Sequence, residues 1–150
     1  MNDAAVIVRR TFPVRRERLF RAFTDPGELV RWFSPDGYGN PSADVDLRPG
    51  GRYRIAMQEE PGGEPFYVTG EYRVIEDPAR LVFTWTWEDP AENVRDSVVT
   101  VDFLERTEGT EVVLTHELLP AERRESHTAG WNALLTKLSS RLGAEEGGKR

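Results

Sequence analysis

The segment W-N-A-L-L-T-K-L-S-S-R-L, from Trp131 to Leu142, decides the fold of this chain. Its apolar residues Trp131, Leu135, Leu138 and Leu142 are spaced by four, three and four positions, which places them on one face of a helix. We expect this helix to extend from about residue 121 to Leu142. Such a stripe has to be buried against another element. The sequence therefore predicts a long C-terminal helix that packs against a sheet.

Apolar and polar residues alternate from about residue 44 onward, which is the pattern of half-buried strands. Many of the apolar positions are aromatic, and we expect them on the inner face of one sheet: Tyr53, Phe66, Tyr72, Phe83, Trp85, Trp87 and Phe103. Turn formers such as Pro49-Gly50-Gly51 separate the runs, and the short connections predict an antiparallel meander. Residues 34–43 and 59–65, which are rich in turn formers, read as loops.

The N-terminal part predicts one short strand and two short helices. An extended run ends at Phe12, and an apolar stripe then predicts a helix over residues 14–24. Asp25 fits the N-cap of a second helix, with Pro26 at its first position and Glu28 at the reciprocal position of a capping box. The order of strand, two helices, about six strands and a long helix predicts an α+β fold.

The chain has 150 residues, of which 38% are hydrophobic, and this is enough for one ordinary globular core. We expect a single domain over residues 1–142 and a disordered polar tail over residues 143–150. No run approaches the ~18 apolar residues of a membrane span, and no signal peptide opens the chain. We therefore expect a cytoplasmic protein that does not bind membranes.

Charge and composition exclude several kinds of site. The net charge of −6 argues against nucleic-acid binding. There is no cysteine, and His116 and His127 are the two histidines, so we expect no metal and no cofactor. Six arginines and one acid between Arg9 and Arg21 form a basic segment. This segment is either a patch for an acidic partner or, as we favour, a solvated surface.

A long helix laid across a strongly curved sheet leaves a gap at one end, which large side chains or a ligand fill. The side chains that we predict as walls of a ligand cavity are Tyr53, Met57, Phe66, Tyr72, Phe83, Trp85, Trp131 and Leu135. We expect Gly130 to let the helix approach the sheet. Gly70, inside a strand, predicts a bulge or a close contact with the same helix.

Seven short motifs carry a resemblance to a known family. They are R-T-F-P-V (Arg10–Val14), L-F-R-A-F-T-D-P-G-E-L-V-R-W-F (Leu19–Phe33), P-G-G-R-Y (Pro49–Tyr53), G-E-Y-R-V-I-E (Gly70–Glu76), P-A-R-L-V-F-T-W (Pro78–Trp85), G-T-E-V-V-L-T-H (Gly109–His116) and H-T-A-G-W (His127–Trp131). Their order and spacing resemble the START-like (SRPBCC) superfamily. More narrowly, the chain is similar to stand-alone bacterial relatives of the C-terminal domain of the activator of heat-shock-protein-90 ATPase.

The resemblance implies the helix-grip fold, in which a curved antiparallel sheet of about six to seven strands wraps around a long C-terminal helix. It implies two short helices after the first strand and a hydrophobic cavity between the sheet and the C-terminal helix. It does not fix an activity, because superfamily members include lipid carriers, other ligand binders and polyketide cyclases.

Three functions stay open at this point. The favoured one is non-enzymatic binding of a small hydrophobic or amphipathic ligand, such as a lipid or a polycyclic aromatic. The second is a stress-associated accessory module that contacts a chaperone, with self-association also open. The third is a cyclase-like enzyme that uses His116 or His127 as a general acid or base. A filled core would favour interaction, a dry apolar cavity would favour carriage, and a histidine in the cavity wall would favour catalysis.

Overall fold

The structure, a computed structural model, describes residues 5–148. Within these residues there are eight strands: β1 (Val6–Phe12), β2 (Tyr38–Gly39), β3 (Ala43–Val45), β4 (Arg52–Glu59), β5 (Phe66–Glu76), β6 (Arg80–Trp87), β7 (Ser97–Arg106) and β8 (Gly109–Glu117). The same residues form the helices α1 (Arg16–Thr24), α2 (Pro26–Trp32) and α3 (Arg124–Gly148), and the short 3-10 helices η1 (Pro90–Glu92) and η2 (Ala121–Arg123).

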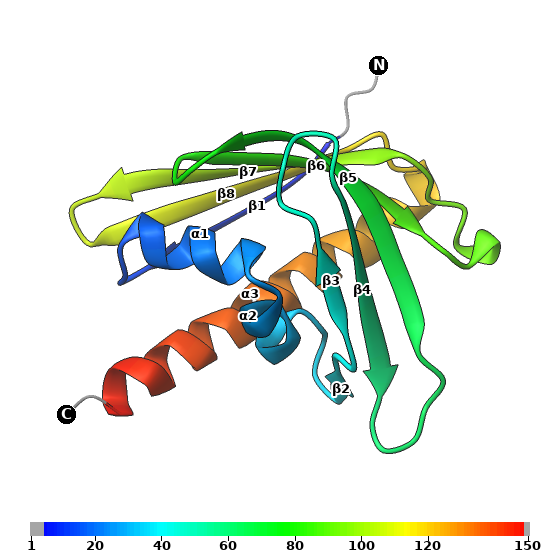
Figure 1. Ribbon diagram of the computed structural model, residues 1–150, viewed down its shortest axis with the longest axis horizontal. Helices are drawn as coiled ribbons and strands as arrows, with labels where there is room; N and C mark the ends of the chain where they lie inside the picture. The colour runs from blue at the N-terminus through cyan, green and yellow to red at the C-terminus, as the bar shows by residue number, and fades with distance from the viewer. Residues whose placement is uncertain (1–4, 149–150) are drawn as a thin grey trace.

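The described strands form one antiparallel sheet in the order β1-β8-β7-β6-β5-β4-β2, and β3 also pairs with β4. Figure 1 shows the curvature of this sheet: β1, β7 and β8 run across the molecule, whereas β4 and β5 descend beside them. The long helix α3 crosses the concave side, and α1 and α2 lie on that side as well (Figure 1). This arrangement confirms the predicted α+β helix-grip fold.

One of the eight described strands, β2, lies within the segment 34–43 that reads as a loop, and β3 begins at the last residue of that segment, so the sheet has more strands than the six to seven expected. β2 pairs Tyr38 with Glu59, and β3 pairs Ala43 with Ile55, both along β4. β3 lies where the alternating pattern begins, at about residue 44, so the sequence does give a signal for this strand. A strand of two residues such as β2 is too short to show an alternating pattern, and the sequence gives no signal for it.

The junction between α1 and α2 confirms the predicted N-cap. The Asp25 carboxylate accepts a hydrogen bond from the Gly27 backbone N–H (3.3 Å), and Pro26 follows as the first helical residue. The reciprocal half of the capping box was expected at Glu28. Instead, the Glu28 carboxylate lies 3.2 Å from the Arg18 guanidinium and 3.5 Å from that of Arg21. Its charge thus joins the two helices by ion pairs.

The basic segment has partners within the chain itself. The Arg9 guanidinium lies 3.7 Å from the Glu111 carboxylate on β8, and Arg10 donates to the Thr136 hydroxyl on α3 (3.0 Å). Together with the ion pairs of Glu28, these contacts give several arginines of the segment a partner on another element of the fold. They fit the solvated-surface interpretation of the segment.

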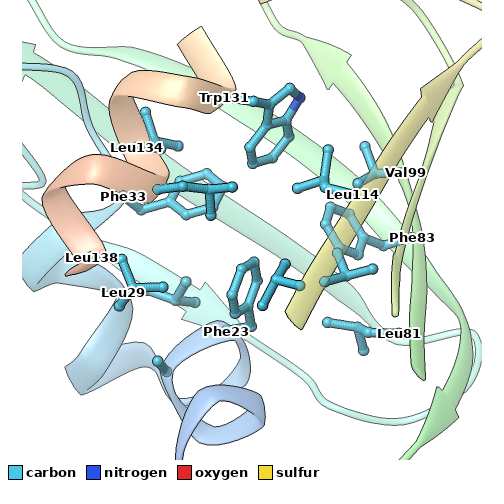
Figure 2. Packing of buried hydrophobic residues seen from close by; sticks show 14 of the residues in the cluster. Phe23, Leu29, Phe33, Leu81, Phe83, Val99, Leu114, Trp131, Leu134 and Leu138 are labelled. Atoms are coloured by element: carbon cyan, nitrogen blue, oxygen red, sulfur yellow. The ribbon is translucent and has the colours of Figure 1, made fainter. Parts of the chain in front are cut away.

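The core lies between α1, α2 and α3 on one side and the concave face of the sheet on the other. Figure 2 shows this cluster, with Trp131, Leu134 and Leu138 from α3, Phe23, Leu29 and Phe33 from the α1–α2 region, and Leu81, Phe83, Val99 and Leu114 from the strands. Most of these side chains are less than 5% exposed. The packing explains why the stripe on α3 predicts the fold so well: it is the stripe that the sheet covers.

Gly70 makes room for an aromatic ring and not for a helix. The Tyr53 hydroxyl donates to the Thr84 carbonyl oxygen (2.6 Å), and its ring crosses directly over Gly70. A Cβ at residue 70 would lie 2.6 Å from the Tyr53 ring and would overlap the Thr84 carbonyl. The register shift of this strand lies further along, between Tyr72 and Val74. The expected contact of Gly70 with the C-terminal helix is therefore wrong.

The last helix is longer than expected, because α3 continues to Gly148 where the sequence predicts an end near Leu142. Of the predicted polar tail, residues 149 and 150 lie outside the described residues. No helix in the described part of the chain is long and apolar enough to cross a bilayer.

Candidate functional site

A cavity of about 440 Å³ lies between the N-terminal half of α3 and the part of the sheet formed by β4, β5 and β6. The residues around it are Pro35, Met57, Phe66, Tyr67, Trp85, Trp87, Asp89, Glu92, Ser126, His127, Gly130, Trp131 and Leu134. Its walls are mostly apolar, whereas Asp89 and Ser126 at the rim are exposed. The cavity is therefore open to solvent beside polar residues, and aromatic rings form its inner wall.

Strand geometry explains the wall that the sheet provides. Met57 on β4 is paired with Phe66 on β5, and Trp85 and Trp87 are two residues apart on β6, so each pair presents neighbouring side chains to one face. The ring centroids of Phe66 and Trp87 are 5.7 Å apart, and those of Trp85 and Trp87 are 5.4 Å apart. The wall is a continuous aromatic surface.

The opposite wall is one edge of α3. His127, Gly130, Trp131 and Leu134 follow one another at spacings of three, one and three, so they share a side of the helix. Leu135, one position further, turns toward the main core and is 1% exposed. The helix thus has a core face and a cavity face, which overlap at Trp131.

The structure brings four of the eight predicted wall residues to the cavity: Met57, Phe66, Trp85 and Trp131. The other four lie elsewhere in the buried core: Tyr53, Tyr72, Phe83 and Leu135. The first three of these surround a void of about 10 Å³, which is the space of a single water at most. The same void is lined by Phe23, Leu29 and Phe33, so the rings of Tyr53, Tyr72 and Phe83 pack against the α1–α2 region and not against the cavity.

The sequence also missed part of the lining. Leu134 is predictable as a lining residue, because it lies three residues after Trp131 and therefore on the same side of the helix. Asp89 and Glu92 belong to a connection between strands, whose position no periodicity predicts. Gly130 was expected to allow close contact with the sheet, but a Cβ at this position would meet no atom within 4 Å. Gly130 therefore borders open space in the cavity.

His116 lies at the centre of a buried chain of hydrogen bonds. The Trp131 indole N–H donates to His116 Nδ1 (3.0 Å). A neutral imidazole then carries its proton on Nε2, which donates to the Ser97 hydroxyl oxygen (2.9 Å). The Ser97 hydroxyl donates in turn to the Trp85 carbonyl oxygen (2.7 Å). Both imidazole nitrogens and the Ser97 hydroxyl have partners, so His116 anchors Trp131 to the sheet.

His127 forms a similar pair at the cavity wall. The Trp87 indole N–H donates to His127 Nε2 (2.9 Å), so the proton is on Nδ1, which donates to the Arg123 carbonyl oxygen (2.8 Å). The rings of His116 and His127 lie 5.4 Å apart, edge to face. Burial, with a contribution from His127, lowers the pKa of His116 from 6.5 to about 3. Burial also lowers the pKa of His127.

Acidic side chains outside the cavity form no further site in the described part of the chain. Asp44 and Asp46 are both exposed, and Asp46 forms an ion pair with Arg48 (3.0 Å). No group of three or more histidine, aspartate or glutamate side chains in the described part of the chain could hold a metal ion. The cavity is therefore the feature whose chemistry remains to be explained.

The fold has close counterparts among solved structures. The AHSA1 protein from Silicibacter pomeroyi is 29% identical over 95% of this chain and 99% of its own, with a TM-score of 0.82. The AHSA1-like protein from Aeromonas hydrophila is 25% identical, over 95% and 94% of the two chains, with a TM-score of 0.82. A protein from Chromobacterium violaceum is 24% identical, covers 91% and 94%, and has a TM-score of 0.83.

No curated protein is significantly similar in sequence. The family model described as activator of Hsp90 ATPase homolog 1-like protein matches residues 13–143, which include all of the cavity lining. The predicted resemblance is thereby confirmed, and the chain belongs to the family of activator of Hsp90 ATPase homolog 1-like proteins.

Proposed function

We propose that this protein binds a small hydrophobic or amphipathic molecule in the cavity between α3 and the sheet. The observation that carries the proposal is the cavity itself, whose volume of about 440 Å³ lies within the range of small-molecule sites. Apolar walls with a few polar groups at one end are typical of such sites. A lipid chain or a polycyclic aromatic fits this description.

The walls support the proposal because hydrogen bonds within the protein hold them in place. Trp131 is anchored by His116 and Trp87 by His127, each through an indole N–H. Trp85 packs between them, with centroids 4.9 Å from Trp131 and 5.4 Å from Trp87. Fixed aromatic walls lower the ordering cost of binding, since little side-chain freedom is left to lose.

Gly130 offers a test that separates binding from folding. In Gly130→Leu, the new side chain enters the open space of the cavity, and in Gly130→Ala the cavity stays almost unchanged. Both changes favour the helix, because glycine is a poor helix former. We expect the neutral dye Nile red to bind the wild type and the alanine variant saturably, and the leucine variant to lose this binding without loss of thermal stability.

Native mass spectrometry of freshly purified protein complements the titration, because a co-purifying ligand adds a defined mass. Gly130→Leu should lack that mass, and Gly130→Ala should keep it. Equal dye binding by all three proteins, or absence of both dye binding and a co-purifying ligand in the wild type, would overturn the proposal.

A further inference from the structure

The charged groups in the cavity lining have one sign. Its ionisable carboxylates are Asp89 and Glu92, and among the described lining residues there is no lysine or arginine. Burial lowers the pKa of His127, and its Nε2 already accepts the Trp87 indole N–H (2.9 Å). Asp89 has no ion-pair partner within residues 5–143, and its Oδ1 caps η1 by accepting from the Ala91 N–H (3.0 Å). A ligand at the rim therefore meets a carboxylate that no cation neutralises.

The cations Arg123 and Lys137 lie near the cavity and are already engaged. The Arg123 guanidinium lies 3.6 Å from the Glu92 carboxylate. The Lys137 ammonium donates to the Ser34 carbonyl oxygen (3.3 Å), the Ser34 hydroxyl (3.1 Å) and the Tyr38 carbonyl oxygen (3.1 Å). Neither group lines the cavity. An anionic ligand head would thus find no free cation there.

The aromatic wall acts in the same direction. Phe66, Trp87, Trp85 and Trp131 form an unbroken series of rings, with centroid distances of 5.7, 5.4 and 4.9 Å. Their faces carry negative electrostatic potential, which attracts a cation and repels an anion, and indole is the strongest of these groups. An apolar cavity with such walls favours cations that are themselves weakly hydrated.

From this juxtaposition we propose that the ligand of the cavity is a hydrophobic organic cation, an amine or quaternary ammonium joined to an apolar body. The apolar body fills the space between α3 and the sheet, and the cationic group lies against the indole faces and the carboxylate of Asp89. This inference rests on the proposed function and names the chemical class of its ligand.

Three probes of matched shape test the proposal by displacement of Nile red: (2-naphthylmethyl)trimethylammonium, its neutral carbon analogue 2-neopentylnaphthalene, and the anion 2-naphthylacetate. We expect the cation to bind about tenfold more tightly than the anion. We also expect it to bind at least as tightly as the neutral analogue, although the latter is the more hydrophobic of the two.

Two variants identify the groups responsible. Asp89→Asn removes the charge but keeps an oxygen that can cap η1, and should weaken the cation about threefold while leaving the neutral analogue unchanged. Phe66→Leu keeps an apolar wall but removes an aromatic face. It should also weaken binding of the cation about threefold and leave binding of the neutral analogue unchanged. Glu105→Gln changes the net charge equally at an exposed position on β7, far along the strand from the cavity, and should affect neither probe.

The outcomes separate the two proposals. If the neutral or anionic probe binds and the cation binds more weakly than the anion, the cation proposal is wrong and the cavity still binds ligands. It is also wrong if Asp89→Asn and Glu105→Gln change the cation affinity equally, because net charge would then explain the effect. If no probe and no dye binds and no ligand co-purifies with the wild type, both proposals fail.

Discussion

Mild acid should destabilise this protein through His116, which is buried with 0% exposure at the centre of its hydrogen-bonded chain. Its folded-state pKa is lowered from 6.5 to about 3, chiefly by burial. Below pH 6.5 the His116 imidazole therefore binds a proton in the unfolded chain, whereas it stays unprotonated in the folded chain until the pH approaches 3. The stability from this group is complete above pH 6.5 and is lost as the pH falls toward 3.

The size of the effect follows from the linkage relation. One proton bound by the unfolded state alone costs about 1.4 kcal/mol for each pH unit. Between pH 7.5 and 5.0, His116 should therefore lower the free energy of unfolding by about 2 kcal/mol. His127 adds to the loss in the same direction, because burial lowers its pKa as well. The carboxylate of Glu88, whose pKa is lowered by its hydrogen bond to Arg54, contributes only below its ordinary pKa of 4.5.

Urea unfolding at a series of pH values from 7.5 to 5.0 measures this slope. His116→Gln should be less stable than the wild type at pH 7.5, since a flexible amide replaces the rigid ring that joins Trp131 to Ser97, and its stability should depend less on pH by about one proton. The NMR signal of the His116 imidazole gives a direct check, and should not titrate above pH 5. A His116 signal that titrates near pH 6.5, or an unchanged slope in His116→Gln, would refute the reasoning.

Three further predictions concern stability. Gly130→Ala should raise the free energy of unfolding by about 1 kcal/mol, seen as a higher Tm, because the Cβ meets open space in a helix; a lower Tm would contradict this placement. Gly70→Ala should cost about 2–3 kcal/mol in urea unfolding, because its Cβ overlaps a neighbouring carbonyl oxygen, and a neutral result would show that the strands can separate there. Lys137→Met should cost about 1.5 kcal/mol by the same assay, because the ammonium makes three hydrogen bonds to Ser34 and Tyr38, and an unchanged urea midpoint would show that these bonds add nothing.

The fold could be predicted because its main elements carry periodic patterns. The stripe on α3 and the alternating aromatics on β4 to β6 each describe a face that something must cover. Asp25 and Pro26 predict the start of a helix from neighbouring residues alone, because an N-cap carboxylate and a proline at the first position suit a helix N-terminus. Glu28 shows the limit of such local rules, because two arginines on the neighbouring helix compete for its carboxylate. Contacts of this kind between two elements follow no fixed spacing in the sequence, so a sequence pattern cannot predict them.

The residues that line the cavity are harder to predict from the sequence than the fold, for a related reason. Periodicity says that Phe83 and Trp85 share a face, but the curvature of the sheet decides which of them meets the cavity, and Trp85 does. On α3, Leu135 belongs to the strongest part of the apolar stripe and is therefore core, whereas Leu134 at its edge lines the cavity. The residues at the margin of an apolar stripe are those that border a gap, since the centre of the stripe is where packing is closest.

His127 is the residue on which binding and catalysis make different demands. It lies in the cavity wall, which by position alone favours an acid–base role, and a general base needs a free lone pair near pH 7. The lone pair of His127 Nε2 already accepts the Trp87 indole N–H (2.9 Å), and its other nitrogen donates to the Arg123 carbonyl oxygen. To take a proton from a substrate, it would have to release Trp87 and lose an aromatic wall of the cavity. The arrangement instead uses the imidazole to fix an indole, as His116 does for Trp131, and it therefore favours the proposed ligand binding over catalysis.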